Sequence, residues 1–425
     1  MHAMVLLLAL SPLQGSDEAL ARAVDAYAAP LERAGYLSGA LLIARGDDVL
    51  CERFFGQASY ELGVPVGPET RFCIASVTKP MTIALAARLL AQEKLSAEDT
   101  LERWIPGFAD GKRITVEQLL NHRAGFRHRV TTTEQETVPR TAAGMAELAR
   151  LATPIFAPGE RSEYSSAGYS VLARVLELAG GKSYGELLEE QVFAPLNMRA
   201  SAHADGRSLL RGRAASYLLS AKGPINAPLK DLSFLVGAGS VWSTARDLYR
   251  LQRGILRGEL GPGVQAAIGA ADGLEWNGLT NGYRAFADYH AEDELHVIFT
   301  GNLYSGAVDD LRAAVPRLAR GEELPPAEVP AVHVVDLDPA ELSACQGLYR
   351  SGPGRDDMPL QVDGDLVLCG ERVLWPTSPT TFFSPADFGT VTVQKDEKGV
   401  PAKLDWVGPG FSLHWEFVGP LPPPR

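Results

Sequence analysis

Runs of apolar residues divide the region before residue 323 into strand-like ends and a helical middle. Gly39–Ala44 and Val49–Phe55 flank the turn sequence RGDD and predict a β-hairpin. Tyr283–Tyr289 and Leu295–Thr300 predict two later strands. Because strands open and close this region, the simplest architecture is one sheet that joins both ends and packs against a buried helix.

The segment Ser76–Leu95 predicts that buried helix. Within Pro80–Ala91 only Thr82 and Arg88 are polar, and a helix that is apolar nearly all round must be buried on most sides. The polar stretch 127–144 predicts a surface loop, of the kind that can cover a site. Further helices are predicted at Asp17–Ala34, Thr115–His122, Met145–Leu151, Ser166–Ala179, Tyr184–Val192 and Thr244–Gly258.

The pattern changes after the Pro-rich stretch Leu324–Pro330. Short alternating runs separated by turns now predict a small all-β domain, in which we see no catalytic cluster. We therefore divide the chain into a signal peptide (1–16), a main α/β domain (17–323), a Pro-rich linker (324–335) and a β-rich domain (336–425). The predicted strands of the last domain are Leu360–Val362, Asp365–Cys369, Glu371–Trp375, Gly389–Gln394, Ala402–Val407 and Ser412–Val418.

Composition and charge narrow the class of partner. The chain has 425 residues, of which 46% are hydrophobic, and a formal net charge of -12. An acidic chain repels phosphate backbones, so nucleic acid is not an expected partner. The apolar run Ala3–Leu10 is too short to span a bilayer and resembles a secretory signal, with cleavage near Gly15. We expect export to the periplasm or the extracellular space; the alternative is an irregular start to a cytosolic protein, since no Lys or Arg precedes the run.

Cysteines and histidines give no metal-ligand pattern, and we expect neither metal nor cofactor. Their spacing matches no zinc or Cys-x-x-Cys motif. In an exported protein Cys51–Cys73 and Cys345–Cys369 are candidate disulfides, but four cysteines allow three pairings, and four buried free thiols are the equal alternative. We expect packing roles for His122, His128 and His290.

A Ser-x-x-Lys motif starts the buried helix. Ser76 and Lys79 are one helical turn apart, so their side chains share a face. The start of a helix favours a developing alkoxide, and a buried lysine with a lowered pKa can accept the hydroxyl proton. The motif is common by chance, and the alternative is a capping serine beside a solvated lysine. Phe72, Ile74 and the apolar helix argue against full solvation.

Two later segments carry further candidate chemistry. Tyr164 lies at a turn, where a phenol can reach a nucleophile, and the hydroxyl of Ser166 can bond the lysine. Trp276-Asn277-Gly278-Leu279 leads into the late strands, and a strand edge beside a nucleophile can supply a backbone N–H to an oxyanion hole. Each segment alone equally describes a packed tyrosine or an ordinary turn.

Taken together, in this order and spacing, these elements resemble the serine β-lactamase and penicillin-binding-protein superfamily, in its class C-like branch with carboxylesterases and D-amino-acid peptidases. The resemblance implies an α/β (α+β) fold of the β-lactamase/transpeptidase type, with an antiparallel sheet flanked by helices. The last domain resembles the β-rich modules often attached to such enzymes. Other matching segments are Ile114–Phe126, Pro158–Tyr184, Val192–Met198 and Gly237–Leu251.

The resemblance also implies residue roles. Ser76 attacks a carbonyl and forms an acyl-enzyme, Lys79 accepts its proton, and Tyr164 assists proton transfer to the leaving group and to water. The backbone N–H groups of Ser76 and Leu279 form the oxyanion hole. The residues of the Trp276–Gly278 motif line the substrate edge.

Two motifs depart from the common family pattern. Ser166 stands where Asn is usual, which leaves fewer hydrogen bonds for Lys79. The third motif usually begins with Lys or His and ends with Gly; Trp276-Asn277-Gly278 keeps the Gly, and the second-ranked register Leu279-Thr280-Asn281 keeps the Thr. Either way the cation that would bind a substrate carboxylate is missing. The departure favours neutral esters or amides over efficient β-lactam hydrolysis.

Three hypotheses follow. The first is an acyl-transferring serine hydrolase with a small ester, amide or peptide substrate, whose acyl-enzyme passes to water or to another acceptor. The second is a catalytically weak homologue that binds peptidoglycan fragments or another ligand. The third makes the β-rich domain a carbohydrate or protein adaptor, although Trp375, Trp406 and Trp415 are expected to be core or strand-packing residues. Oligomeric state stays open.

Overall fold

A five-stranded antiparallel sheet forms the centre of the main domain in this computed structural model, which describes residues 12–261, 263–352 and 357–421. Strand β1 pairs with β12 from Gly39↔Gly301 to Arg45↔Leu295, so both ends of the region meet in one sheet, as the apolar runs predict. In spatial order the strands are β10 (Leu274–Thr280), β11 (Tyr283–His290), β12 (Leu295–Gly301), β1 (Gly39–Arg45) and β2 (Asp48–Phe55).

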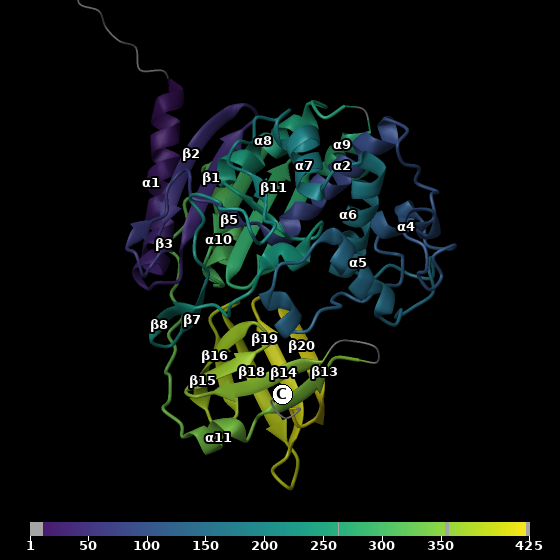
Figure 1. The fold of residues 1–425 in the computed structure, drawn as a ribbon. Coiled ribbons are helices and arrows are strands. Elements are labelled where there is room, and N and C mark those ends of the chain that lie inside the picture. The colour runs from purple at the N-terminus through teal and green to yellow at the C-terminus, as the bar shows by residue number, and fades with distance from the viewer. Residues whose placement is uncertain (1–11, 262, 353–356, 422–425) are drawn as a thin grey trace, which may run out of the picture.

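On β1, β11 and β12, alternate residues enter two different cores. On β1, Leu42 packs with the cluster around α2 (Thr78–Ala91) and α8 (Ala245–Leu256). Leu41 faces the opposite way, toward α1 (Pro12–Arg33) and α10 (Ala307–Ala319). Helices therefore cover both faces, and Figure 1 shows α2 deep within the domain. Because most of α2 is buried, the prediction of a central core helix is confirmed.

The other predicted helices of the main domain are present with shifted ends, and α3, α9 and α10 occur where no helix was predicted. The predicted helix at Tyr184–Val192 is two elements, because its second half is a π-helix, η3 (Glu189–Phe193). The predicted loop 127–144 contains a 3-10 turn, η2 (Glu134–Thr137), and its last residues start α5. The helices are α3 (Leu101–Trp104), α4 (Val116–Leu120), α5 (Ala142–Leu151), α6 (Ser166–Gly180), α7 (Tyr184–Leu188) and α9 (Val264–Ile268).

The C-terminal region is a closed barrel in which every strand is antiparallel to its neighbours. Figure 1 shows it below the main domain. The expectation of a small all-β domain is confirmed, but two of its strands, β13 and β17, were not predicted. The strands are β13 (Gly347–Arg350), β14 (Met358–Asp363), β15 (Leu366–Cys369), β16 (Arg372–Ser378), β17 (Thr381–Ser384), β18 (Gly389–Lys395), β19 (Pro401–Gly408) and β20 (Phe411–Gly419).

The barrel packs against the main domain through the outer face of β16. The Trp375 Nε1 group donates a hydrogen bond to the Leu219 carbonyl at 3.0 Å. Val373 and Phe383 join the apolar cluster that includes α1 and α10. Residues 322–338, which include the predicted linker, have neither helix nor strand. They lie along the main domain, where the Ala327 N–H donates to the Tyr27 carbonyl at 3.0 Å.

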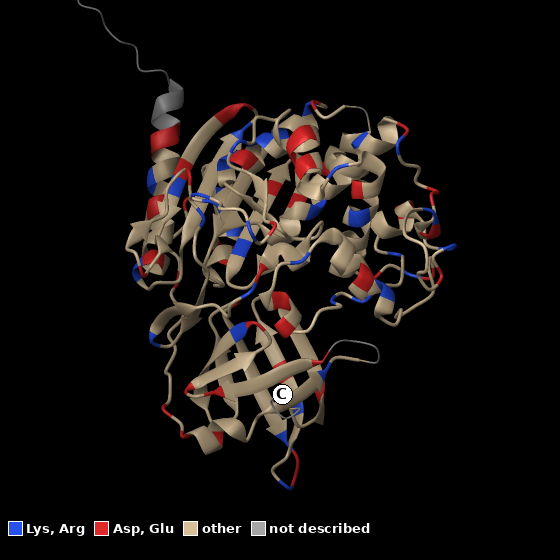
Figure 2. Cartoon of the chain, viewed as in Figure 1, with Lys and Arg blue, Asp and Glu red and all other residues tan. Residues whose placement is uncertain are grey.

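The structure also bears on the predictions about cysteines, export and charge. All four cysteines are buried free thiols, so the disulfide alternative is wrong for this structure. The apolar run Ala3–Leu10 lies outside the described residues. Within the described chain no helix is long and apolar enough to cross a membrane. Figure 2 shows that acidic and basic residues are interspersed along the chain in both domains.

Candidate active site

Ser76 lies on a tight turn that feeds the central helix. The turn is a 3-10 segment, η1 (Ala75–Val77), and α2 begins directly after it at Thr78. Ala75 has a positive φ of 46°, a conformation that costs an L-residue about 1–2 kcal/mol. Such strain persists only where the surrounding structure enforces it, and it recurs at functional sites. The surrounding core thus fixes the backbone that presents the Ser76 hydroxyl.

Lys79 meets this hydroxyl without any acidic partner. Its Nζ lies 3.2 Å from Ser76 Oγ and donates to the Ala238 carbonyl at 2.9 Å. The side chain is buried, and burial lowers the pKa of Lys79 to about 7 because desolvation disfavours the charged amine. A large fraction of Lys79 is therefore neutral near pH 7, and a neutral amine can accept a proton. The chain brings Ser76 and Lys79 together as the Ser-x-x-Lys spacing predicts.

Tyr164 completes a triangle of polar atoms. Its hydroxyl donates to Ser76 Oγ at 2.7 Å, and Lys79 Nζ lies 4.6 Å from the centre of its ring. Burial raises the pKa of Tyr164, although the hydrogen bonds to Ser76 and Ser166 lower it in part. The phenol is therefore protonated at neutral pH. The residue is still 46% exposed, so this triangle is open to solvent on the tyrosine side.

Ser166 takes a different partner from the one expected. It is buried in the first turn of α6, whose N-cap is Ser165. Its hydroxyl interacts with Tyr164, whereas the hydrogen bonds of Lys79 go to Ser76 and to the Ala238 carbonyl. The expected bond from Ser166 to Lys79 is therefore absent. The Ala238 carbonyl accepts a hydrogen bond from Lys79 in place of Ser166. A backbone acceptor belongs to no side-chain motif, so the sequence could not predict it.

Strand β10 closes the site at Gly278. A Cβ added to Gly278 would lie 2.1 Å from the Ile74 carbonyl oxygen and 3.2 Å from the Ser76 nitrogen, so only glycine allows this strand to approach the nucleophile. The backbone N–H of Asn281, in the rival register, donates instead to Glu371 Oε2 at 3.1 Å. The contacts therefore favour the Trp276-Asn277-Gly278 register.

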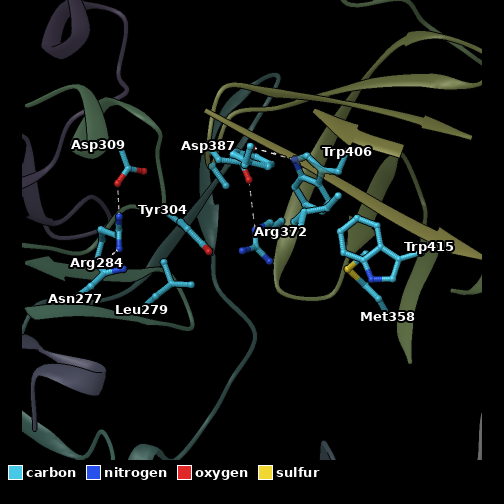
Figure 3. Close-up of a pocket in the computed structure, with 13 residues that line it drawn as sticks. Asn277, Leu279, Arg284, Tyr304, Asp309, Met358, Arg372, Asp387, Trp406 and Trp415 are labelled. Carbon is cyan, nitrogen blue, oxygen red and sulfur yellow. Dashed lines mark hydrogen bonds and ion pairs between the residues drawn. The ribbon is translucent and has the colours of Figure 1, made fainter. Parts of the chain in front are cut away.

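The side chain of Asn277 lies on the face of β10 opposite to the one that approaches Ser76. Successive side chains of a strand point to opposite faces, so Trp276 shares a face with Gly278 and Asn277 does not. Asn277 Oδ1 accepts a hydrogen bond from Arg284, on the far side of the strand (Figure 3). Trp276 is half-buried against the core that contains α2.

Two histidines expected only to pack lie beside the triangle. The His122 ring centre is 4.7 Å from that of Tyr164, and its Nδ1 accepts from the Ser165 N–H at 3.1 Å. The His128 ring centre is 5.5 Å from that of Tyr164, and the two rings are tilted by 35°. Burial, with a smaller contribution from the Lys79 charge, lowers the pKa of His122 to about 4. Both rings therefore hold the tyrosine in place as neutral groups. Because the histidines are far from Tyr164 in the sequence, their contact with it could not be predicted.

No group of three or more His, Cys, Asp or Glu side chains that could hold a metal occurs among the described residues. The site instead brings the hydroxyl of Ser76 into contact with the buried amine of Lys79, whose pKa is lowered, and with the phenol of Tyr164. A fold of this type with these groups together points to the class of β-lactamase-related serine hydrolases. Residues 20–285 match the family model described as Beta-lactamase, and the chain belongs to this family.

Relatives and solved structures agree with this assignment. The chain is 25% identical over 223 residues to "Putative penicillin-binding protein PbpX" of Bacillus subtilis, which covers 52% of this chain and 56% of the relative. It is 33% identical over 201 residues to "Esterase EstB" of Burkholderia gladioli, covering 42% and 50%. The matches thus span about half the length of these curated relatives. The crystal structure of SurE matches with a TM-score of 0.63 at 22% identity, over 95% of this chain and 100% of that one, which shows the shared fold.

Proposed function

We propose that this protein is a serine hydrolase that cleaves a neutral ester or amide through an acyl-enzyme on Ser76. The observation that carries the proposal is the contact of Ser76 Oγ with both a lysine of lowered pKa, at 3.2 Å, and a tyrosine hydroxyl, at 2.7 Å. A nucleophile with an adjacent base is the arrangement that covalent catalysis requires.

In the first half-reaction Ser76 Oγ bonds to the substrate carbonyl carbon and its proton passes to the neutral amine of Lys79. The negative charge on the carbonyl oxygen would be held by the backbone N–H groups of Ser76 and Leu279; the close approach of Gly278 to the Ser76 nitrogen supports this pairing. Collapse of the intermediate breaks the bond to the leaving group. The Tyr164 hydroxyl can protonate that group, and the proton held by Lys79 restores the phenol.

In the second half-reaction water attacks the acyl-enzyme. Its proton passes to the Tyr164–Lys79 pair, a bond forms to the acyl carbon, and Ser76 Oγ leaves and regains a proton. An alcohol or amine in place of water would give acyl transfer by the same steps. The exposed side of Tyr164 supports access for either acceptor.

The substrate class follows from the groups on β10. The residues of β10 on the same face as Gly278, which approaches Ser76, are Trp276 and Thr280. Neither is cationic. A carboxylate next to the scissile bond would have no charged partner on this strand. Neutral esters are therefore the favoured substrates, and the match to an esterase supports this choice.

The test is hydrolysis of p-nitrophenyl butyrate by the purified protein and by Ser76→Ala, with the folding of both checked by circular dichroism. We expect turnover by the wild type and none above background by the variant. Transfer of a butyryl mass to the Ser76 peptide in a quenched sample would identify the nucleophile directly. Equal background rates would support the weak binding homologue instead.

A further inference from the structure

A cavity lies between β10 and the barrel, on the side of β10 opposite Ser76. Its volume is about 350 Å³, within the range of small-molecule sites. Asn277 and Leu279 line it from the sheet, and Met358, Trp406 and Trp415 line it from the barrel. Figure 3 shows these side chains converging from the two domains on a common space. None of the proposed catalytic steps uses this cavity.

The barrel residues that line this cavity come from the interior of the barrel. Trp406 packs in the barrel core. Leu413 is paired with Trp406, and Trp415 is paired with Leu404, which is also buried in that core. Directly paired residues share a face of the sheet, so Leu413 and Trp415 belong to the inner face. The cavity is therefore the open mouth of the barrel, and an eight-stranded barrel can hold one small ligand.

One cation in this mouth has an unused hydrogen-bond donor. Arg372 Nε is buried and makes no hydrogen bond. Its nearest acidic oxygen, Asp387 Oδ2, is 3.8 Å away, while Asp387 Oδ1 accepts from Trp406 Nε1 at 3.2 Å. The guanidinium is positioned by ring contacts, 5.2 Å from the Tyr304 centre and 5.1 Å from that of Trp406.

Arg284, the other arginine of this cavity, has two of its donor nitrogens engaged. It bonds Asn277 and forms an ion pair with Asp309. The Arg372 side chain is 31% exposed, although its Nε atom itself is covered, and Asp387 Oδ2 lies beyond hydrogen-bond distance. Because its guanidinium also lines the cavity, Arg372 is the cation best placed to receive an oxygen acceptor from a ligand there.

The cavity is also adjacent to the chemistry. Strand β10 is at the edge of its sheet, and an edge strand can pair with an extended ligand through its free backbone groups. Gly278 lies against Ser76, and the next side chain, Leu279, points into the cavity. An extended substrate on this edge would present alternate groups to the two faces, so one of them would reach the barrel.

We propose that the barrel mouth is a substrate subsite that takes an aromatic substituent with an oxygen acceptor beside it. The rings of Trp406 and Trp415 would pack on the substituent, and Arg372 would donate to its carbonyl or carboxylate oxygen. This inference rests on the proposed hydrolase function. In this proposal Arg372 of the barrel binds a polar group of the substrate. The family's third-motif cation, which would otherwise provide such a contact, is missing here.

Binding can be measured without catalysis in the Ser76→Ala protein. We expect 4-phenylbutyrate to quench tryptophan fluorescence saturably, and Arg372→Gln in the same background to weaken its binding at least about tenfold. Arg350→Gln is the matched control, since Arg350 pairs with Asp357 on the barrel and does not line the cavity. Binding of 4-phenylbutanamide as tight as that of the acid would identify a carbonyl as the preferred acceptor, and weaker binding a carboxylate. No saturable binding of either, or binding unaffected by Arg372→Gln, overturns the proposal.

Kinetics separates this subsite from the catalytic proposal. Trp415→Ala should leave p-nitrophenyl acetate hydrolysis unchanged and lower kcat/KM about tenfold for a phenyl-terminated ester. The phenyl-terminated ester is tested in two forms, a 5-phenylpentanoate ester with an extended acyl group and 5-phenylpentyl acetate with an extended leaving group. For one of the two, Trp415→Ala should lower kcat/KM. Val407→Ala, on the outer face beside Trp406, is the control. If neither ester responds while acetate turnover persists, the subsite is wrong and the hydrolase proposal stands; if Ser76→Ala is as active as wild type, the hydrolase proposal itself fails.

Discussion

Two buried lysines in this protein have opposite surroundings. Lys79 is 5% exposed and contacts only neutral oxygens, those of Ser76 and of the Ala238 carbonyl. The Lys230 side chain is 8% exposed, and its Nζ lies 2.7 Å from a carboxylate oxygen of Glu136 and 2.7 Å from one of Glu371. The comparison teaches that burial alone does not decide what a lysine does. Without a counter-charge the amine gives up its proton readily, and between two carboxylates it acts as a structural cation.

The Lys230 cluster joins three segments of the chain. Glu371 lies in the turn between β15 and β16 of the barrel, and Glu136 lies in the loop that carries His128. Glu371 also accepts from the Asn281 N–H, just after β10. The cluster therefore ties the barrel to both sides of the candidate active site. We expect the two lysines to respond in opposite ways to the same substitution.

The largest expected effect is on activity. Lys79→Met should reduce kcat/KM by about 10³-fold or more, because the nucleophile loses its base. Its melting temperature should stay equal or rise, since the apolar methionine removes a desolvated amine. Lys230→Met should keep kcat/KM within about tenfold of the wild type. Steady-state kinetics with p-nitrophenyl butyrate measures both, and equal losses in the two variants would contradict the comparison.

The next effect is on stability. Lys230→Met should lower the free energy of unfolding by about 3 kcal/mol, because it leaves two buried carboxylates without their shared cation. Arg129, whose guanidinium is 3.0 Å from Glu371, limits the loss. Urea denaturation of both lysine variants measures it. Adding Glu136→Gln to Lys230→Met should restore part of the stability, and a further loss in the double variant would count against the charge argument.

The stabilisation from Glu371 should depend on pH. Burial raises the pKa of Glu371, but the charges of Arg129 and Lys230 and its hydrogen bonds outweigh this and lower it to about 2. A carboxylate with a lowered pKa stabilises the fold above its unfolded pKa and loses that contribution as pH falls toward the folded value. The free energy of unfolding of the wild type should thus exceed that of Glu371→Gln by about 2–3 kcal/mol at pH 7. This difference should become smaller between pH 4.5 and 2. A difference that is constant with pH would argue against this ion pair.

The pH–rate profile tests Lys79 itself. Its pKa of about 7 lies below the usual value, and the base must be neutral, so kcat/KM should rise with pH through about 7 and fall about tenfold per unit below it. Tyr164→Phe should lower the rate without moving this limb, because the pKa of Tyr164 is raised. A limb that shifts with Tyr164→Phe would assign the titration to the tyrosine.

The smallest effect is expected for an exposed ion pair between the same two domains. Lys222 Nζ lies 2.5 Å from Asp365 on the barrel, with both side chains largely in solvent. Water and salt screen such pairs. Lys222→Ala should therefore leave the melting temperature unchanged within error. A clear decrease would mean that exposure is a poor guide to which contacts hold the barrel.

The sequence determined the central sheet and helix of this protein because their patterns are local. Short strand-like runs located β1, β11 and β12, and the almost unbroken apolar stretch located α2. The spacing of Ser76 and Lys79 placed two side chains on one helical turn, and the glycine of the third motif fixed how closely β10 could approach. Side chains alternate along any strand, so once β10 is seen to be a strand, Asn277 and Gly278 must face opposite ways.

Only the tertiary structure decided which groups surround these residues. The Ala238 carbonyl, His122 and Glu371 come from distant segments and carry no motif, because a backbone acceptor or a packed ring has no sequence signature. Closure of the barrel likewise depends on β13 pairing with β20, across the whole domain. Local patterns determine which residues share a face, whereas long-range packing determines which groups that face contacts. This packing makes Lys79 a candidate base and makes Lys230 a structural cation.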